Sequence, residues 1–297
     1  MPEEITNSMP EGGYEKPADT PDTPAPQQKV ISNEPEPAKP RNAAVGLTGQ
    51  THAQFPGEPV TLPSRGILYP ENHPCRSGII HVRPITTKEE EILATERLQR
   101  QGIALDMVMQ RCIMTPGIDT MDLLSGDRTM IFFYLRAISY GPIYKFEARM
   151  KDGSTQMIET NVANLKIDFL DEDFQEPHVV TIDGVTYEFI LSRGRHEQET
   201  IRNRLRGKKN PNAVETTATQ TLRNLIVSVN GDTDSKVISN HIDNMIAMHA
   251  HKVRKVINDV SPGPVLEEEV INDSTGELEE VMVQVTESFF RPDLDSE

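Results

Sequence analysis

Three histidines and one serine are the residues whose types could form a metal or nucleophile site. His241, His249 and His251 fall on or near one expected helix, but their spacing differs from the i, i+4 pair with which a helix binds zinc. We expect His241 to pack between helices and the other two to be solvated. Ser139 lies in a small-x-Ser-x-Gly pattern, yet it closes a helix, whereas a nucleophile elbow lies between a strand and a helix. The sequence therefore predicts no metal site and no catalytic residue.

Cofactor and thiol chemistry have equally little support. The chain contains neither a P-loop nor the glycine pattern of a dinucleotide-binding turn. Its two cysteines, Cys75 and Cys112, are too few for a disulfide framework or an all-cysteine zinc site, and they fit a reducing compartment. We expect a protein that is not an enzyme and that binds no cofactor.

A basic segment at 193–209 is the strongest local charge feature, with seven Arg or Lys and two Glu residues. These bases could neutralise phosphates, but no aromatic residue is interleaved to stack on bases. Two interpretations stay open, namely a solvated helix face and a surface for an acidic protein partner, and nucleic acid is not the expected partner. Arg202, Arg204 and Arg206 are the residues that such a partner would contact.

The acidic character of the chain lies at its two ends. The net charge is −16, of which residues 1–45 carry −4 and residues 265–297 carry −10. The rest is nearly neutral, so it lacks the broad basic face of a nucleic-acid-binding protein. The longest strongly apolar stretch, Met130–Leu135, is far shorter than the roughly 20 residues of a membrane helix. The acidic N-terminus differs from a signal peptide. We expect a soluble intracellular protein with no membrane partner.

The chain is expected to divide into four parts of an α+β fold, a mainly helical body with several β-hairpins. Residues 1–55 form an acidic, proline-rich tail that cannot bury enough apolar surface to order itself. Residues 56–192 form an α+β domain with N-terminal strands, three helices and two β-hairpins. Residues 193–264 form the basic segment and a helical hairpin. Residues 265–297 form an acidic hairpin and a Phe-Phe-Arg-Pro arm.

Capping and turn residues place the elements of the second part. Thr87 and Glu90 have the spacing of a capping box, and apolar periodicity indicates further helices over Ile103–Met114 and from Ser125 to Gly141. Two Asp-Gly turns, at 152–153 and 183–184, each indicate a β-hairpin.

The third part is expected to pair two helices. Apolar residues at helical spacing indicate one helix over 218–229 and a second over 237–260, antiparallel to the first. The second helix carries Met245 and Met248, whose flexible side chains suit an adaptable binding face.

Four segments, taken in this order and spacing, are similar to a known family. They are Leu62–Tyr69, Val82–Leu93, Leu124–Gly141 and Phe289–Pro292. Together they resemble the T-even-type phage baseplate-hub assembly proteins, also described as tail assembly chaperones. The resemblance covers about residues 60–292.

The resemblance implies a late, non-enzymatic factor of phage tail morphogenesis, which works in the host cytoplasm and contacts tape-measure or baseplate hub proteins. The alternative that it leaves open is a structural subunit retained in the baseplate of the virion tail. Relatives carry cysteine pairs, suggestive of zinc ribbons, in hairpins that correspond to 145–155 and 270–280. This chain has no cysteine in either range, so we expect no metal there. The oligomeric state is left open.

Candidate partner contacts come from the first segment, the long helix, the basic segment, the methionines and the C-terminal arm. They are Arg65, Tyr69, Arg128, Arg136, Tyr140, Arg202, Arg204, Arg206, Met245, Met248, Phe289 and Phe290. For Arg128 and Arg136, an internal salt bridge is an equally good interpretation. Phe289 and Phe290 could instead dock on the body and close its core, because two exposed aromatic side chains would form an apolar patch.

Overall fold

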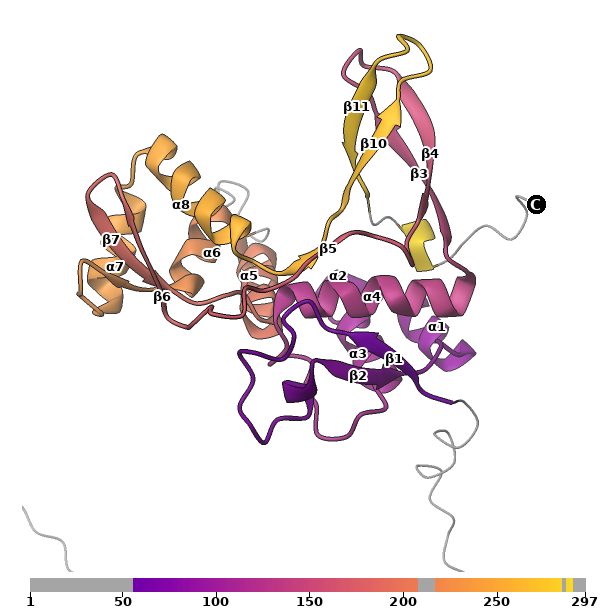
Figure 1. Ribbon diagram of the computed structural model, residues 1–297, viewed down its shortest axis with the longest axis horizontal. Coiled ribbons are helices and arrows are strands. Elements are labelled where there is room, and N and C mark those ends of the chain that lie inside the picture. Colours follow the sequence, from indigo (N-terminus) through magenta and orange to yellow (C-terminus); the bar gives the residue numbers. More distant parts are fainter. Residues whose placement is uncertain (1–55, 208–216, 285–286, 291–297) are drawn as a thin grey trace, which may run out of the picture. The chain divides into compact units, whose positions relative to one another are not determined.

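The computed structural model describes residues 56–207, 217–284 and 287–290, which all lie in one of the chain's two units, Thr48–Glu297 (Figure 1). The expected tail, 1–55, lies outside the described residues. Helices and small antiparallel sheets both occur, which confirms the expected α+β class. In the part of the chain that the structure describes, no helix is both long and apolar enough to cross a bilayer.

A long loop joins the first two strands. Strand β1 (Glu58–Thr61) pairs with β2 (Ile79–Val82), and the loop between them contains the short 3₁₀ helix η1 (Pro74–Ser77). Within this loop Arg65 and Gly66 both have positive φ angles, so the chain turns sharply directly after Ser64.

Four helices follow: α1 (Thr87–Ala94), α2 (Glu96–Gln101), α3 (Ala104–Cys112) and α4 (Ser125–Tyr140). The capping box lies one residue earlier than the sequence predicts, at Thr86 and Glu89 in place of Thr87 and Glu90. The carboxylate of Glu89 accepts hydrogen bonds from the backbone amide and the hydroxyl of Thr86, at 3.1 and 2.6 Å, so Thr86 is the N-cap. Glu90 in turn is exposed.

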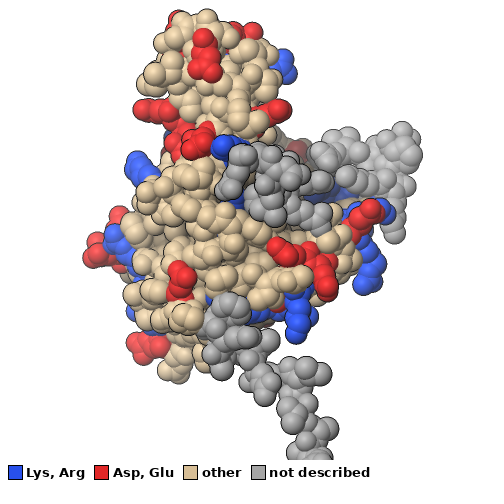
Figure 2. Space-filling view, turned by 90° about the vertical axis from the view of Figure 1, so that its right-hand side faces the viewer, with Lys and Arg blue, Asp and Glu red and all other residues tan. Residues whose placement is uncertain are grey.

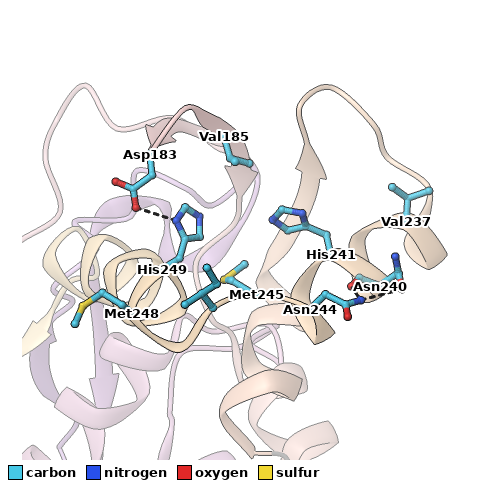
Figure 3. A pocket seen from close by; sticks show the side chains of 10 residues that line it. Asp183, Val185, Val237, Asn240, His241, Asn244, Met245, Met248 and His249 are labelled. Atoms are coloured by element: carbon cyan, nitrogen blue, oxygen red, sulfur yellow. Dashed lines mark hydrogen bonds and ion pairs between the residues drawn. The ribbon is translucent and has the colours of Figure 1, made fainter.

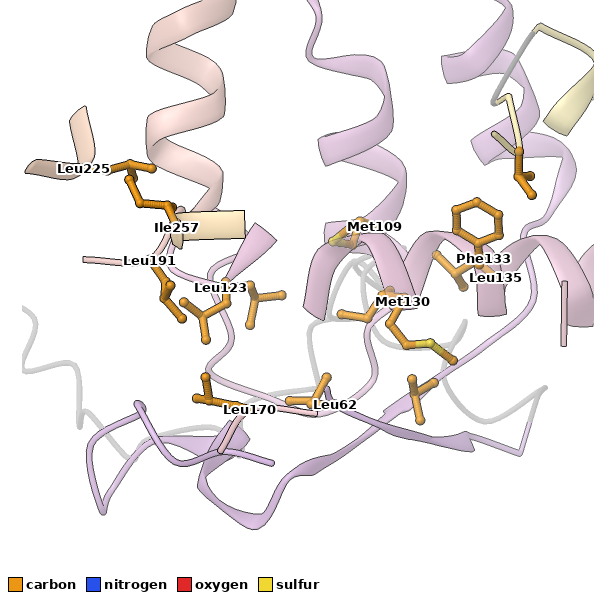
Figure 4. Close-up of a cluster of buried hydrophobic side chains, with 14 of the residues drawn as sticks. Leu62, Met109, Leu123, Met130, Phe133, Leu135, Leu170, Leu191, Leu225 and Ile257 are labelled. Carbon is orange, nitrogen blue, oxygen red and sulfur yellow. The ribbon is translucent and has the colours of Figure 1, made fainter. Parts of the chain in front are cut away.

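Helix α4 lies within the main hydrophobic core (Figure 4). Ile131 and Phe133 are both buried although they point to different sides of the helix, so α4 is covered on more than one side. It ends at Gly141, whose φ of 88° few other residues adopt.

Two hairpins lie side by side (Figure 1). Strand β3 (Ile143–Arg149) pairs with β4 (Thr155–Asn161), and β10 (Glu267–Ile271) pairs with β11 (Leu278–Met282). The hydroxyl of Tyr144 donates a 2.7 Å hydrogen bond to the carbonyl of Gln284, which ties the two hairpins together. A short antiparallel pair is formed by β5 (Ile167–Asp168), which follows β4 in the sequence, and β9 (Gly263–Pro264), which precedes β10.

A three-stranded sheet contains the second Asp-Gly hairpin. Its strands are β6 (His178–Ile182), β7 (Val185–Phe189) and β8 (Ile226–Val229). Asp183 and Gly184 have φ angles of 50° and 83°, as the expected two-residue hairpin turn requires. Because β8 pairs with β7, one sheet extends across the boundary that we expected at residue 192.

The expected two-helix hairpin over 218–260 is wrong. Helix α6 (Thr217–Leu225) stops where β8 begins, because β-branched Ile226 and Val229 pair with the free edge of β7. Beyond it, α7 (Ser235–Asp243) and α8 (Ala247–Asp259) are separate helices, with Ile246 extended between them. The described part of the basic segment forms α5 (Gly194–Gly207), and the aromatic pair near the C-terminus lies in η2 (Glu287–Phe290).

Candidate functional site

The segment 62–70 is attached to the start of α4 by a buried carboxylate. Asp127 accepts hydrogen bonds from the amide and the hydroxyl of Ser64, at 2.9 and 2.6 Å, and from the hydroxyl of Tyr69 at 2.7 Å. The Tyr69 oxygen also accepts the backbone amide of Leu124 at 2.9 Å. Burial raises the pKa of Asp127, while the hydrogen bonds from Ser64 and Tyr69 act in the opposite direction. Tyr69 therefore has a structural role within the chain.

Arg128 is also used inside the protein. It is buried and forms ion pairs with Asp106 and with Glu197, the latter at 3.0 Å, and it donates a 2.7 Å hydrogen bond to the carbonyl of Thr120. This is the internal salt bridge that the sequence left open, and it joins α3, α4 and α5.

Arg136 is buried at the other end of α4. It donates hydrogen bonds to the carbonyls of Gly141 and Ile143, and its guanidinium lies over the rings of Tyr140 and Tyr144 at 5.5 and 5.9 Å. Burial lowers the pKa of Arg136. Its described hydrogen bonds are thus to backbone carbonyls rather than to a carboxylate.

Arg65 and Tyr140 remain partly accessible. Arg65 forms an exposed ion pair with Glu172 at 3.0 Å and lies over the ring of Phe169 at 4.9 Å. The Tyr140 hydroxyl donates a 2.9 Å hydrogen bond to Glu90. A partner could still reach both side chains.

The two C-terminal phenylalanines dock on the body. Phe289 is fully buried and packs edge-to-face against Phe133 and Tyr144, at 5.0 and 4.9 Å between ring centroids. Phe290 is 7% exposed and contacts Phe132. The structure therefore shows the core-closing arrangement for both residues.

A cavity of about 660 Å³ lies where the β6–β7 turn meets α7 and α8 (Figure 3). Met245 is half-buried in its wall, whereas Ile246 and Met248 are 77% and 66% exposed. The other lining residues are Asp183, Val185, Val237, Asn240, His241, Asn244 and His249. The methionines singled out from the sequence are thus brought together at one concave surface.

Polar groups at this cavity form a continuous chain. The buried Tyr187 hydroxyl lies 2.8 Å from His241 Nε2 and 2.7 Å from His249 Nε2. His249 Nδ1 lies 3.0 Å from Asp183, which is also bound by Lys252 at 2.8 Å. These two contacts hold the pKa of Asp183 below its usual range, and burial raises that of Tyr187. Among the described residues, no three His, Cys, Asp or Glu side chains are placed to hold a metal.

The expectation that His249 is solvated is wrong, because its side chain is only 14% exposed. Its partners Tyr187 and Asp183 lie in the β6–β7 hairpin, more than sixty residues earlier. Spacing along a helix carries no information about such a contact.

The basic residues of 193–207, in α5 and directly before it, fall into two groups. Arg193 pairs with Glu176 at 2.6 Å, and Arg195 pairs with Asp122. Arg202, Arg204 and Arg206 are exposed, and none forms an ion pair with a carboxylate that the structure describes. The second half of α5 is therefore a basic surface.

Comparison with known proteins identifies the chain's relatives. A family model described as T4 bacteriophage base plate protein matches residues 68–291, which is most of the chain. The chain belongs to this family. No curated protein and no solved structure matches the chain. As a phage baseplate protein it interacts with other tail proteins, which confirms the resemblance at this level.

Proposed function

We propose that this baseplate protein is a non-enzymatic tail morphogenesis factor, a hub assembly chaperone that binds a tape-measure or hub protein in the host cytoplasm. The observation that carries the proposal is the cavity between the β6–β7 turn, α7 and α8, with its exposed apolar rim. Its occupant would be the apolar face of a helix, which is the form in which a tape-measure protein presents itself before the tail tube assembles around it.

Three large apolar side chains support a protein partner at this cavity. Val237, Ile246 and Met248 are 44%, 77% and 66% exposed, and all three line the same concave surface. Contiguous exposed apolar groups of this kind mark sites of protein interaction. Flexible methionine side chains can repack around different helical ridges, which suits a transient client.

The two buried thiols and the buried carboxylate of Asp127 support a role without catalysis. Cys75 and Cys112 are buried, and burial raises the pKa of both thiols to about 12, so neither provides a thiolate near neutral pH. The oxygens of Asp127 are engaged by Ser64 and Tyr69, so this buried carboxylate holds the fold together.

The second candidate function is a structural subunit retained in the virion baseplate. The paired hairpins favour it, because their outer faces expose large apolar side chains, among them Met157 at 59% and Ile271 at 62%. A permanent interface could cover these residues in the finished particle.

The test compares tagged wild-type protein with the double variant Ile246→Asp/Met248→Asp, both recovered from infected cells. We expect the wild type to co-purify with a tape-measure or hub protein, and the variant to lose it, since two charges cannot enter an apolar contact. Ile79→Asp/Phe169→Asp is the matched control, because it adds two charges at apolar side chains that are 46% and 42% exposed on other parts of the fold.

Mass spectrometry of purified particles separates the two functions. A chaperone is absent from the particles or far below the copy number of baseplate subunits. If the protein is present at a fixed copy number, the chaperone proposal is wrong and the structural role stands.

A further inference from the structure

The outer face of the β10–β11 hairpin is acidic and apolar. Residues 265–284 contain seven Asp or Glu residues and no Lys or Arg. Side chains alternate along both strands, so one set faces the β3–β4 hairpin and the other faces outward. The outward set is Glu267, Glu269, Ile271, Leu278, Glu280 and Met282. Figure 2 shows acidic side chains, in red, over the paired hairpins at the top of that view.

The inward glutamates are satisfied inside the protein. Glu268 accepts a hydrogen bond from the Thr160 hydroxyl. Glu279 accepts one from the amide group of Asn272 at 2.9 Å and another from the backbone of Lys151 at 2.8 Å. These contacts explain why two acids lie between the hairpins.

Within the described residues, the outward glutamates have no such partners. Glu269 lies directly opposite Glu280 in the register, and like charges at such a position are destabilising. Neither they nor Glu267 form an ion pair with a described Lys or Arg side chain. Beside them Leu278 and Met282 are 63% and 54% exposed. A surface that combines uncompensated acids with apolar groups fits a partner that carries bases and apolar groups.

Helix α5 supplies a surface of this kind. Arg202 and Arg206 are one turn apart, both are exposed, and half-buried Leu205, three residues after Arg202, lies on the adjoining part of the helix surface. Side chains separated by one helical turn are about 6 Å apart. Glu269 and Glu280 lie directly opposite each other on the two strands, with β-carbons about 5 Å apart. The two pairs of charges are therefore opposite in sign and similar in spacing.

We propose that the outer face of β10–β11 binds the second half of α5 in another copy of this chain. Glu269 and Glu280 meet Arg202 and Arg206 there, and Leu205 covers Leu278. Each copy uses two different surfaces, so the contact is head-to-tail and gives rings or short chains. Pairing of one hairpin with another is opposed by their like charges. This contact is independent of the proposed client cavity.

The test uses two charge-reversed variants, Glu269→Lys/Glu280→Lys and Arg202→Glu/Arg206→Glu. In the first variant both surfaces are basic, and in the second both are acidic, so neither can associate with itself. A mixture of the two restores an acidic surface opposite a basic one. Sedimentation velocity of wild type, each variant and the equimolar mixture measures the association, and thermal unfolding checks that each variant folds.

We expect the wild type to associate at about 0.05 M salt and to dissociate at about 0.5 M, where exposed charges are screened. Each variant alone should associate at least about tenfold more weakly, and the mixture should recover the wild-type behaviour. Glu71→Lys/Glu91→Lys, which reverses two exposed charges elsewhere, should leave association unchanged.

Two outcomes overturn the proposal. One is a wild-type protein that stays monomeric at low salt, and this arm needs no variant. The other is a mixture that stays as monomeric as the separate variants. Neither outcome bears on client binding at the cavity, so failure here leaves the proposed function intact.

Discussion

The hydroxyl group of Tyr69 donates a 2.7 Å hydrogen bond to the carboxylate of Asp127, 58 positions further along the chain. This contact joins two of the segments that carry the resemblance to phage baseplate proteins. The same hydroxyl oxygen accepts a hydrogen bond from the backbone amide of Leu124, which directly precedes α4. The side chain of Tyr69 therefore satisfies two buried polar groups at the start of this helix. Tyr69 and Asp127, one from each of these two segments, therefore stabilise the fold, in place of forming a surface for a partner.

Tyr69→Phe should lower the free energy of unfolding by about 1–3 kcal/mol. The substitution leaves the buried amide of Leu124 and one oxygen of Asp127 without their partner. Urea unfolding measures the loss. Tyr134→Phe is the control, because the hydrogen bond from that hydroxyl to Glu58 is long, at 3.3 Å, and a comparable loss there would contradict the assignment.

Arg128→Met should be strongly destabilising, by about 3–5 kcal/mol, because it leaves Asp106 buried without its cation. Arg65→Met breaks an exposed ion pair with Glu172 and should cost about 0–1 kcal/mol. Chemical denaturation of each variant measures the change in the free energy of unfolding. Equal effects of the two substitutions would show that the Arg128 cluster has no special role.

Gly126→Ala should destabilise the protein, although alanine is more favourable than glycine inside a helix by about 1 kcal/mol. A β-carbon at position 126 would lie 1.7 Å from the carbonyl oxygen of Pro262, so the backbone of α4 and that of the 262–264 segment must separate. Gly263→Ala, at the same contact, places its β-carbon 3.5 Å from Gly126 and should be tolerated. Melting temperatures of the two variants decide the matter.

Phe289→Ala should lower the free energy of unfolding by about 3–5 kcal/mol, because it opens a cavity between Phe133 and Tyr144. Phe169→Ala is the control, since Phe169 is 42% exposed. Unchanged denaturation of the Phe289 variant would mean that the C-terminal aromatic pair does not close the core.

Acidification should destabilise the protein through His196. Burial, and then the charges of Arg193 and Arg195, lower the pKa of His196 below its ordinary value of 6.5. The unfolded chain therefore takes up a proton at a higher pH than the folded protein does. This contribution to stability is complete above pH 6.5 and is lost as the pH falls below it. His196→Gln should flatten the measured slope of unfolding free energy between about pH 7 and 5; an unchanged slope would assign it to other groups.

The sequence by itself determined the turns of two hairpins and the position of helix α4. The Asp-Gly turns of two hairpins and the periodic core of α4 appear where their residues indicated, because turn geometry and helical spacing are set within a few residues. The order of the four segments also indicated the phage baseplate family.

Only the tertiary structure decided what the charged and aromatic side chains do. Ile226–Val229 has helical spacing but forms β8, because the open edge of β7 offers backbone hydrogen bonds that no local pattern reveals. Arg128 and His249 are held by partners tens of residues away. Whether an arginine is buried beside an aspartate or free on a surface depends on which elements meet, and that is settled when the chain packs.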